Sequence, residues 1–423
     1  MKKIITFLGI YPKETAYQYQ DSVYRGQVFA EAMHQFLDFD EMLVFVTKAA
    51  FENAYPVLQN LNDERVLPVE IPTGETTDEM WQIFTILTDA VGKGDTVIFD
   101  ITHGLRSLPF LVFLAAAFLK NAKDVTIEAI YYGAFELSKD AQGNPRPAPV
   151  IDLSTFVDLL DWLNASNQFI RTGNATYLAE QIRQAKPNYL RQQEEPLARE
   201  QSIQMSQAAN ALTEVSRALR LILPDQAMAA SEKLQTTLVS ATSALNEYAQ
   251  PFSVLAQQVI DTYSPLALNS PRIQANNIAS MNRERLLIQW YLERNQLVQA
   301  VAIAREWLVS WGVLQADCHD LYNREYRQEV ESAFGRANDQ RRKQSGAFDA
   351  YTFSSGKQLR EFASLKSALI LYEQLGDLRN TLLHAGKRPS TELAETLEKK
   401  VQNLCQQLQQ LPLPMAIQNE ATP

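Results

Sequence analysis

The sequence predicts an α/β domain built on a parallel sheet, followed by an all-α domain. Between residues 1 and 155, short runs that are apolar on both faces, such as MLVFV and VIFDI, alternate with stretches of helical periodicity. This alternation is typical of a parallel sheet covered by helices. After Thr155 the strand-like runs disappear, and the chain becomes rich in Leu, Ala, Gln, Glu and Arg. A chain of 423 residues is also too long for one ordinary core, so we expect two or three domains.

The elements of the first domain follow from the same patterns. Strands are expected at Ile4–Gly9, Met42–Thr47, Val66–Ile71, Thr96–Ile101, Val125–Tyr132 and Val150–Leu153, the last one after a turn-rich segment at 138–149. Helices are expected at Val23–Leu37, between the second strand and Leu61, at Asp78–Val91 and at Leu108–Asn121. Right-handed crossovers make this a doubly wound, Rossmann-like sheet. Ligands of such sheets lie outside the carboxyl ends of the strands.

The helical part is interrupted at Pro-containing and polar stretches. Breaks are expected at Lys186-Pro187-Asn188, at Leu223-Pro224-Asp225 and at Tyr263–Asn277. A polar stretch at Gly335–Gly356, which contains Arg341, predicts an exposed insertion, and the tail after Leu411 is expected to be disordered.

Composition restricts the classes of function. The net charge is −10, so the chain is not suited to coating long nucleic acid, and any RNA should bind in a local basic groove. The cysteines are Cys318 and Cys405, too few for a disulfide framework or a zinc cluster, so no metal and a cytoplasmic location are expected. The apolar stretch at 108–119 is too short to span a bilayer, and no membrane association is expected. We interpret the N-terminal MKKIITFLGIYP as a buried strand rather than a signal peptide.

The expected strand ends carry a candidate ligand site. The principal motif is Asp100-Ile101-Thr102-His103-Gly104-Leu105-Arg106-Ser107, and the other candidates are Gly9, Tyr11 and Thr15 after the first strand and Thr47 after the second. The start of a helix offers free N–H groups to a phosphate, Gly104 lets the backbone approach it, and Arg106 supplies a cation. Neither common Gly-rich phosphate motif is present, which argues against an ordinary dinucleotide or triphosphate site. The alternative is structural, with Thr102 and Ser107 as helix caps and His103 packed under the loop.

A second candidate site is Arg379-Asn380-Thr381-Leu382-Leu383-His384, on a helix that Gly386 and Pro389 are expected to end. Cleavage of RNA without a metal needs a base, an acid and a cation at the phosphorane. His384 can serve as base or acid, and Arg379 matches phosphate geometry. One helix provides one such histidine, so a two-fold dimer would complete the cleft. The alternative is that both side chains interact with the last carbonyl groups of the helix.

A third element, around Arg305 and Glu306, predicts a core helix. Its charged pair could be a buried support for the cleft or an ordinary solvated face.

These residues resemble a known family. The run DITHGLRSLPF resembles the signature of the CRISPR-associated DxTHG-motif proteins, ancillary ribonucleases of type III CRISPR systems, and RNTLLHAG resembles the signature of HEPN ribonucleases. The segments FLGI, FVTKAA, IYYGA, PVIDL and AIAREWL agree with the same family.

The resemblance implies a CARF-like sensor at 1–155, a helical connecting region at 156–290 and a HEPN-like ribonuclease at 291–423. It implies a homodimer or higher homo-oligomer that cuts single-stranded RNA, needs no cofactor, and is activated by cyclic oligoadenylate, with cyclic tetra-adenylate as the expected ring. The catalytic residues would be Arg379 and His384, with Asn380 positioning the substrate. The activator would contact Gly9, Tyr11, Thr47, Thr102, His103, Gly104, Arg106, Ser107, Tyr132 and Gly133.

Two other functions stay open. The CARF domain could also open its cyclic activator, with Thr102 or His103 assisting. The chain could instead be a regulator without nuclease activity whose helical part binds DNA or protein, although the acidic balance argues against a DNA-reading role.

Overall fold

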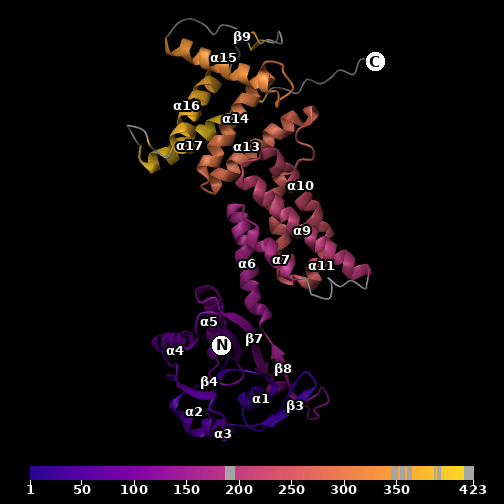
Figure 1. Ribbon diagram of the computed structural model, residues 1–423, viewed down its shortest axis with the longest axis vertical. Coiled ribbons are helices and arrows are strands. Elements are labelled where there is room, and N and C mark those ends of the chain that lie inside the picture. The colour runs from indigo at the N-terminus through magenta and orange to yellow at the C-terminus, as the bar shows by residue number, and fades with distance from the viewer. Residues whose placement is uncertain are drawn as a thin grey trace. The chain divides into compact units, whose positions relative to one another are not determined.

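The computed structural model has two compact units, Met1–Asp161 and Trp162–Pro423 (Figure 1). It describes residues 1–185, 196–343, 351–352, 358–359, 364–384, 387 and 392–413. The first unit contains a mixed sheet with helices, and the second is mostly helical. The predicted order of an α/β region and then a helical region is therefore confirmed.

The sheet of the first unit has eight strands in the order β3-β2-β8-β7-β6-β1-β4-β5. Their bounds are β1 Lys2–Phe7, β2 Thr15–Tyr19, β3 Ser22–Gly26, β4 Glu41–Val46, β5 Val66–Glu70, β6 Thr96–Asp100, β7 Thr126–Gly133 and β8 Ala148–Asp152. The neighbours β5, β4, β1, β6 and β7 are all parallel. In this order β4 and β5 lie on one side of β1, and the later strands β6 and β7 lie on its other side. The crevice of a doubly wound sheet lies at such a reversal, here outside the ends of β1 and β6.

The register explains why the central strands are apolar on both faces. Ile4 pairs with Met42 and Ile98, and all three lie in the buried cluster on one side of the sheet. The next residue, Ile5, pairs with Leu43 and Phe99, which lie in the cluster on the other side. Alternate side chains of a strand point to opposite faces, so helices must cover both.

Helices from different parts of the unit supply these two covers. Their bounds are α1 Phe29–Phe36, α2 Lys48–Asn53, α3 Tyr55–Gln59, α4 Thr77–Asp89 and α5 Leu108–Ala122, with a 3₁₀ turn η1 at Phe135–Leu137. The first three pack in the cluster of Ile4 through side chains such as Phe29 and Tyr55. The other two pack in the cluster of Ile5 through Ile83 and Val112.

The helix predicted at Val23–Leu37 is wrong in its first part. Residues 15–26 form an antiparallel hairpin of β2 and β3 that turns at Gln20, whose φ is 54°. Tyr17 and Tyr19 stand on the same face of β2, Tyr17 fully buried and Tyr19 bonded through its hydroxyl to that of Tyr131 at 2.9 Å. Aromatic residues at alternate positions favour a strand, and the helix therefore begins only at Phe29.

The prediction of a wholly parallel sheet also needs correction. Strand β8 runs antiparallel to β7, and the hairpin continues the sheet beyond β8, because β2 pairs with it in parallel. The chain returns from β7 to β8 through the turn-rich segment at 138–149, where Lys139 and Pro145 form a bridge. A return this short can only join antiparallel neighbours.

The second unit is built from helices around one buried cluster that runs from Trp162 to Leu411. The helix bounds are α6 Thr155–Thr172, which begins in the first unit, α7 Thr176–Gln184, α9 Pro196–Arg220, α10 Pro224–Ser240, α11 Thr242–Tyr248, α12 Gln250–Tyr263, α13 Asn277–Glu293, α14 Leu297–Gln315, α15 Arg324–Arg342, α16 Leu365–Leu383 and α17 Ala394–Gln409. Two 3₁₀ turns, η2 Ser264–Leu266 and η3 Gln274–Asn276, and two short strands, β9 Tyr351–Thr352 and β10 Gln358–Leu359, complete the described elements. The predicted division of the helices at residue 290 stays a prediction.

Helix α14 lies at the centre of this core. Trp307 and Trp311 are its largest fully buried side chains, and their indole N–H groups donate to the carbonyl oxygens of Met281 and Pro412 at 2.9 and 2.8 Å. Among the described residues it is also the one helix long and apolar enough to cross a membrane, but 61% of its most apolar stretch is buried within the protein. Burial of this kind is what a core helix requires.

The predicted breaks at Leu223-Pro224-Asp225 and Tyr263–Asn277 are confirmed, because α10 and α13 begin there. The break at 186–188, the helix-ending Gly386 and Pro389, and the tail from 414 onward lie outside the described residues. The insertion predicted at Gly335–Gly356 is wrong in its first part, since α15 continues to Arg342. Buried Phe334 and Ala337 hold that part of the helix against the core, and Arg341 and Arg342 bond to Glu373 on α16. Residues 344–350 of the predicted insertion lie outside the described part of the chain.

Two glycines inside helices of this unit should respond in opposite ways to alanine. A Cβ atom at Gly312 would lie 2.6 Å from Val330 Cγ1, whereas one at Gly335 would meet nothing within 4 Å. We expect Gly312→Ala to lower the free energy of unfolding by roughly 1–3 kcal/mol through overpacking. Gly335→Ala should raise it by about 0.5–1 kcal/mol, because alanine favours a helix interior. Urea unfolding followed by tryptophan fluorescence measures both, and equal shifts in the two variants would contradict the packing of α14 on α15.

Candidate functional site

The loops after β1 and β6 meet at the reversal point of the sheet. A Cβ atom at Gly9 would lie 3.8 Å from the amide nitrogen of Gly104. Gly104 has a φ of +112°, and a Cβ there would approach Leu108 Cδ1 to 2.8 Å and Phe7 Cβ to 3.3 Å. This position therefore requires glycine. Two of the predicted ligand residues thus lie together, and the backbone of Gly104 is exposed.

The buried carboxyl group of Asp100 organises these strand ends. The side chain is 0% exposed and accepts hydrogen bonds from the Thr6 hydroxyl at 2.6 Å and from the Thr102 N–H at 2.7 Å. Thr102 in turn accepts a bond from the Gly133 N–H at 2.8 Å through its own hydroxyl oxygen. The chain of bonds joins the ends of β1, β6 and β7. Thr102 therefore joins strands and does not cap a helix.

His103 is held by the protein itself. The N–H of Phe29, the first residue of α1, donates to His103 Nε2 at 3.2 Å, and the Tyr17 hydroxyl lies 3.5 Å from the same nitrogen. A nitrogen that accepts from a backbone N–H carries no proton, so the ring is neutral. Burial lowers the pKa of His103, and the nearby Asp100 opposes this shift, whereas burial raises the pKa of Asp100. The half-buried ring thus packs under the loop, as the structural interpretation predicted.

Three other predicted residues of this site are exposed. Tyr11 is 88% exposed. Arg106 is exposed and has neither a hydrogen bond nor an ion pair with any residue in the described ranges. Ser107 precedes α5 without a capping bond, and its hydroxyl contacts Met80 Sδ at 3.8 Å, so the predicted cap is absent there.

The remaining predicted residues have structural partners. Thr47 caps α2 by accepting from the Ala50 N–H at 3.3 Å, and Thr15 starts β2. The Tyr132 hydroxyl donates to Glu136 at 2.6 Å, and burial followed by this bond raises the pKa of Tyr132 to about 12. Gly133 is buried against Tyr17, where a Cβ would approach Tyr17 Cε1 to 2.9 Å.

The sequence interpretation missed two lysine side chains near these loops. Lys13 lies in the loop after β1, with its Nζ 4.0 Å from the ring centre of Phe135, and Lys48 is the exposed first residue of α2, directly after β4. A lysine in a loop is too common for spacing to single it out. Topology places both at the carboxyl end of the sheet, as it does Arg106.

The second candidate site lies at the end of α16. Arg379 is half-buried, and Asn380 and His384 are exposed. The N–H of His384 donates to the Asn380 carbonyl at 3.0 Å, so the helical turn includes His384. Within the described residues, the side chains of Arg379 and His384 make no hydrogen bond or ion pair. The alternative in which both bind the last helix carbonyls is therefore not seen.

Arg305 supports the helix that carries this motif. Its guanidinium bonds to Glu331 on α15 at 3.1 Å, to the Tyr372 hydroxyl on α16 at 2.9 Å and to the adjacent Glu306 at 3.1 Å. Tyr372 lies two turns before Arg379 on the same helix. Of the two interpretations of Arg305, the supporting pair fits better than the solvated face, because the side chain is 20% exposed and joins three helices.

Comparison with known proteins points to CRISPR systems. Residues 158–268 match the family model of the second domain of CRISPR-associated protein MJ1674. A stretch of 113 residues is 30% identical to CRISPR-associated protein MJ1674 of Methanocaldococcus jannaschii, and it covers 26% of this chain and 17% of that protein. This similarity supports the assignment of the chain as a CRISPR-associated protein. The residues matched by the family model fall on the helices from α6 to η2, the region whose motifs are least distinctive, and include neither candidate site.

The neutral state of His103 can be measured. With its pKa below the ordinary value of about 6.5, the unfolded chain binds the proton first as the pH falls, so this group costs stability below pH 6.5. We expect the ring ¹⁵N resonances of His103 to keep their neutral values as the pH passes 6.5. The resonance is assigned by its loss in His103→Gln, and protonation at or above pH 6.5 would contradict the Phe29 bond.

Proposed function

We propose that this chain is a ribonuclease of a CRISPR defence system that cuts single-stranded RNA at Arg379 and His384 without a metal. We further propose that cyclic oligoadenylate, bound at the strand ends of the α/β unit, switches it on. The observation that carries the proposal is the Arg-x4-His motif on the last turn of α16, with His384 exposed and both side chains unbonded within the described residues. The similarity to a CRISPR-associated protein supports the biological setting.

The chemistry follows from these side chains. His384 takes the proton of the 2′-hydroxyl or returns one to the leaving 5′-oxygen, and Arg379 neutralises the charge of the phosphorane. Asn380 stands one turn before His384 on the same face and can orient the sugar or phosphate. A second copy of the chain supplies the second histidine, so base and acid are present together.

The strand-end site suits an anionic ring with aromatic bases. Exposed Arg106, Lys13 and Lys48 provide cations, and the exposed backbone at Gly104 can approach a phosphate. Tyr11, 88% exposed, offers a face on which adenine can stack. A ring of repeated units lets two protomers contact it through the same residues, with cyclic tetra-adenylate as the expected size.

An exposed apolar stripe on α5 supports the proposal that two copies of the chain associate. Phe110, Leu114 and Phe118 recur every fourth residue on α5 and are 71%, 43% and 47% exposed. Three large apolar side chains on one face favour association. Because Phe110 lies four residues after Arg106, a two-fold contact on this face would bring two copies of Arg106 towards one ligand.

The geometry gives less support to the two other functions. His103 Nε2 already accepts the Phe29 N–H, so this nitrogen is not free to act as a base on the activator. A regulator without nuclease activity would have no need of an exposed histidine next to Asn380 and Arg379. Its test is the same as that of the nuclease.

Arg379→Ala and His384→Ala should each lower RNA cleavage by about 10²–10⁴-fold, the usual contribution of a general acid–base group. His319→Ala is the matched control, because His319 lies in the same unit, has a side chain that is 42% exposed, and pairs with Asp317. The measurement is cleavage of a fluorescent single-stranded RNA in EDTA with saturating activator. Wild-type rates in either variant would remove the catalytic assignment, and resistance of RNA with a 2′-deoxy scissile sugar would confirm the nucleophile.

Arg106→Ala should raise the activator concentration for half-maximal cleavage by roughly 10–100-fold, the usual worth of one charge-assisted hydrogen bond. The maximal rate should stay, because Arg106 is not part of the RNA site. Arg25→Ala is the control, since Arg25 is exposed on β3 and pairs with Glu14. An unchanged activator dependence would contradict the binding role of Arg106.

A further inference from the structure

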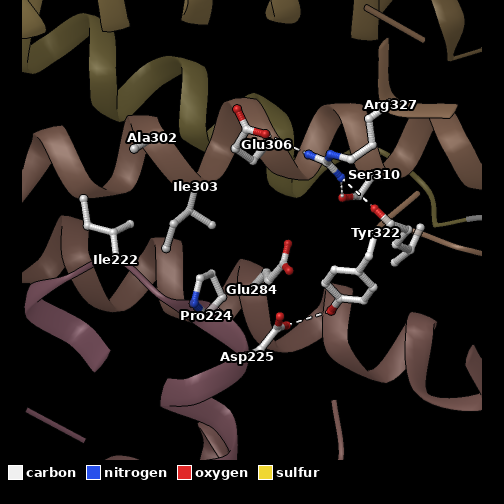
Figure 2. Close-up of a pocket in the computed structure, with 11 residues that line it drawn as sticks. Ile222, Pro224, Asp225, Glu284, Ala302, Ile303, Glu306, Ser310, Tyr322 and Arg327 are labelled. Atoms are coloured by element: carbon white, nitrogen blue, oxygen red, sulfur yellow. Dashed lines mark hydrogen bonds and ion pairs between the residues drawn. The ribbon is translucent and has the colours of Figure 1, made fainter. Parts of the chain in front are cut away.

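A pocket of about 500 Å³ opens between helices of the second unit (Figure 2). Its volume lies in the range of small-molecule sites. Ile222, Ala302 and Ile303 line one side, and charged groups line the other. None of the residues assigned above to RNA or activator lies among its lining residues.

One carboxylate of the pocket, Asp225, is fully engaged. It accepts a hydrogen bond from the Tyr322 hydroxyl at 2.8 Å and an ion pair from Arg272 Nε at 2.9 Å. The Arg272 guanidinium also lies over the Tyr322 ring, 4.8 Å from its centre. Charge at this end of the pocket is therefore balanced.

Glu306 is balanced in the same way. One of its oxygens accepts from Arg327 at 2.7 Å and the other from Arg305 at 3.1 Å. Arg327 further donates to the Ser310 hydroxyl at 2.9 Å and to the Leu321 carbonyl at 3.0 Å. This arginine is thus committed to protein acceptors and is not free to bind an anionic ligand.

Glu284 on α13 stands between these two pairs without a partner. Its carboxyl group has no hydrogen bond or ion pair with any residue of the described ranges, and it faces the pocket (Figure 2). Burial, with the charges of Asp225 and Glu306, raises the pKa of Glu284 to about 8, while Arg327 acts in the opposite direction. An unpaired carboxylate in such a place is costly unless a cation joins it.

The residues around Glu284 favour an ammonium group over a metal ion as the bound cation. No group of three or more His, Cys, Asp or Glu among the described residues is placed to hold a metal ion. An ammonium group has three donors and can bond to Glu284 while also reaching the oxygen atoms of neighbouring side chains. A short hydrocarbon attached to it would cover the wall formed by Ile222, Ala302 and Ile303.

We propose that this pocket binds a small aliphatic amine, with its ammonium group on Glu284 and its hydrocarbon part on Ile222, Ala302 and Ile303. Recognition needs both halves, since the ammonium restores charge balance and the hydrocarbon removes apolar wall from water. The proposal does not depend on the proposed ribonuclease activity.

The binding should depend on pH. Only the ionised carboxylate pairs with the amine, so at pH 7 binding expels a proton from Glu284. Affinity should rise about tenfold per unit up to pH 8 and level off above it, while the amine, with a pKa near that of lysine, stays charged. The charged and titratable groups facing Glu284 are Asp225 on α10, Glu306 on α14, Arg327 on α15 and Tyr322 in the loop before α15.

Isothermal titration calorimetry of the whole chain with n-butylamine tests the proposal. 1-Butanol serves as the neutral probe of equal length, and buffers of different ionisation heat reveal the released proton. We expect saturable binding of the amine with release of nearly one proton at pH 7 and almost none at pH 9.5, and no binding of the alcohol. Absence of saturable amine binding at pH 9 in the wild type would overturn the proposal.

Two variants and a control locate the site. Glu284→Gln should weaken butylamine binding at least tenfold at pH 9, and Ala302→Leu should weaken it by filling the space beside the apolar wall. Glu293→Gln, an exposed carboxylate at the end of the same helix, should bind as the wild type does. Equal binding by wild type and Glu284→Gln would place the butylamine elsewhere and refute the assignment, as would loss of binding in Glu293→Gln. Circular dichroism confirms that each variant is folded.

Discussion

The buried carboxyl group of Asp100 is the interaction on which the α/β unit depends. It holds the Thr6 hydroxyl from β1 and the Thr102 N–H that follows β6, and Thr102 carries the connection on to β7. A carboxyl group this deeply buried is tolerable only because it is hydrogen-bonded. The bonds keep three parallel strand ends at one level, so the loops that follow them begin side by side at one edge of the sheet.

Most residues of the motif that begins at Asp100 are bonded or packed within the protein. Thr102, His103 and Gly104 are used by the protein itself, through the Gly133 bond, the Phe29 bond and the close contacts with Phe7 and Leu108. Arg106 is left free of partners in the described chain. Most side chains of this motif thus build the support of the loop, and in the proposed binding of an activator the exposed backbone at Gly104 and the Arg106 guanidinium supply the contacts.

In the helical unit, the described charged groups around α14 are paired with one another, with one exception. Arg305 joins α14, α15 and α16 through satisfied bonds, and Arg327 and Arg272 balance Glu306 and Asp225. Glu284 is the exception, a carboxylate with a raised pKa and no partner in the described residues, at the edge of a pocket. Strongly shifted pKa values of groups in clefts are common at functional sites.

The sequence by itself determined the five parallel strands, the helices on both faces and the change to a helical unit, because apolar periodicity is a local property. It also brought forward Arg379, His384 and the strand-end motif. Only the tertiary structure decided that Tyr17 and Tyr19 belong to a hairpin, that β8 runs antiparallel, and that Thr102 serves Gly133 while Arg106 stays free. Glu284 shows the reason most clearly: its helix carries no local signal, and its meeting with Asp225, Glu306 and Arg327 depends on contacts between segments far apart in the chain.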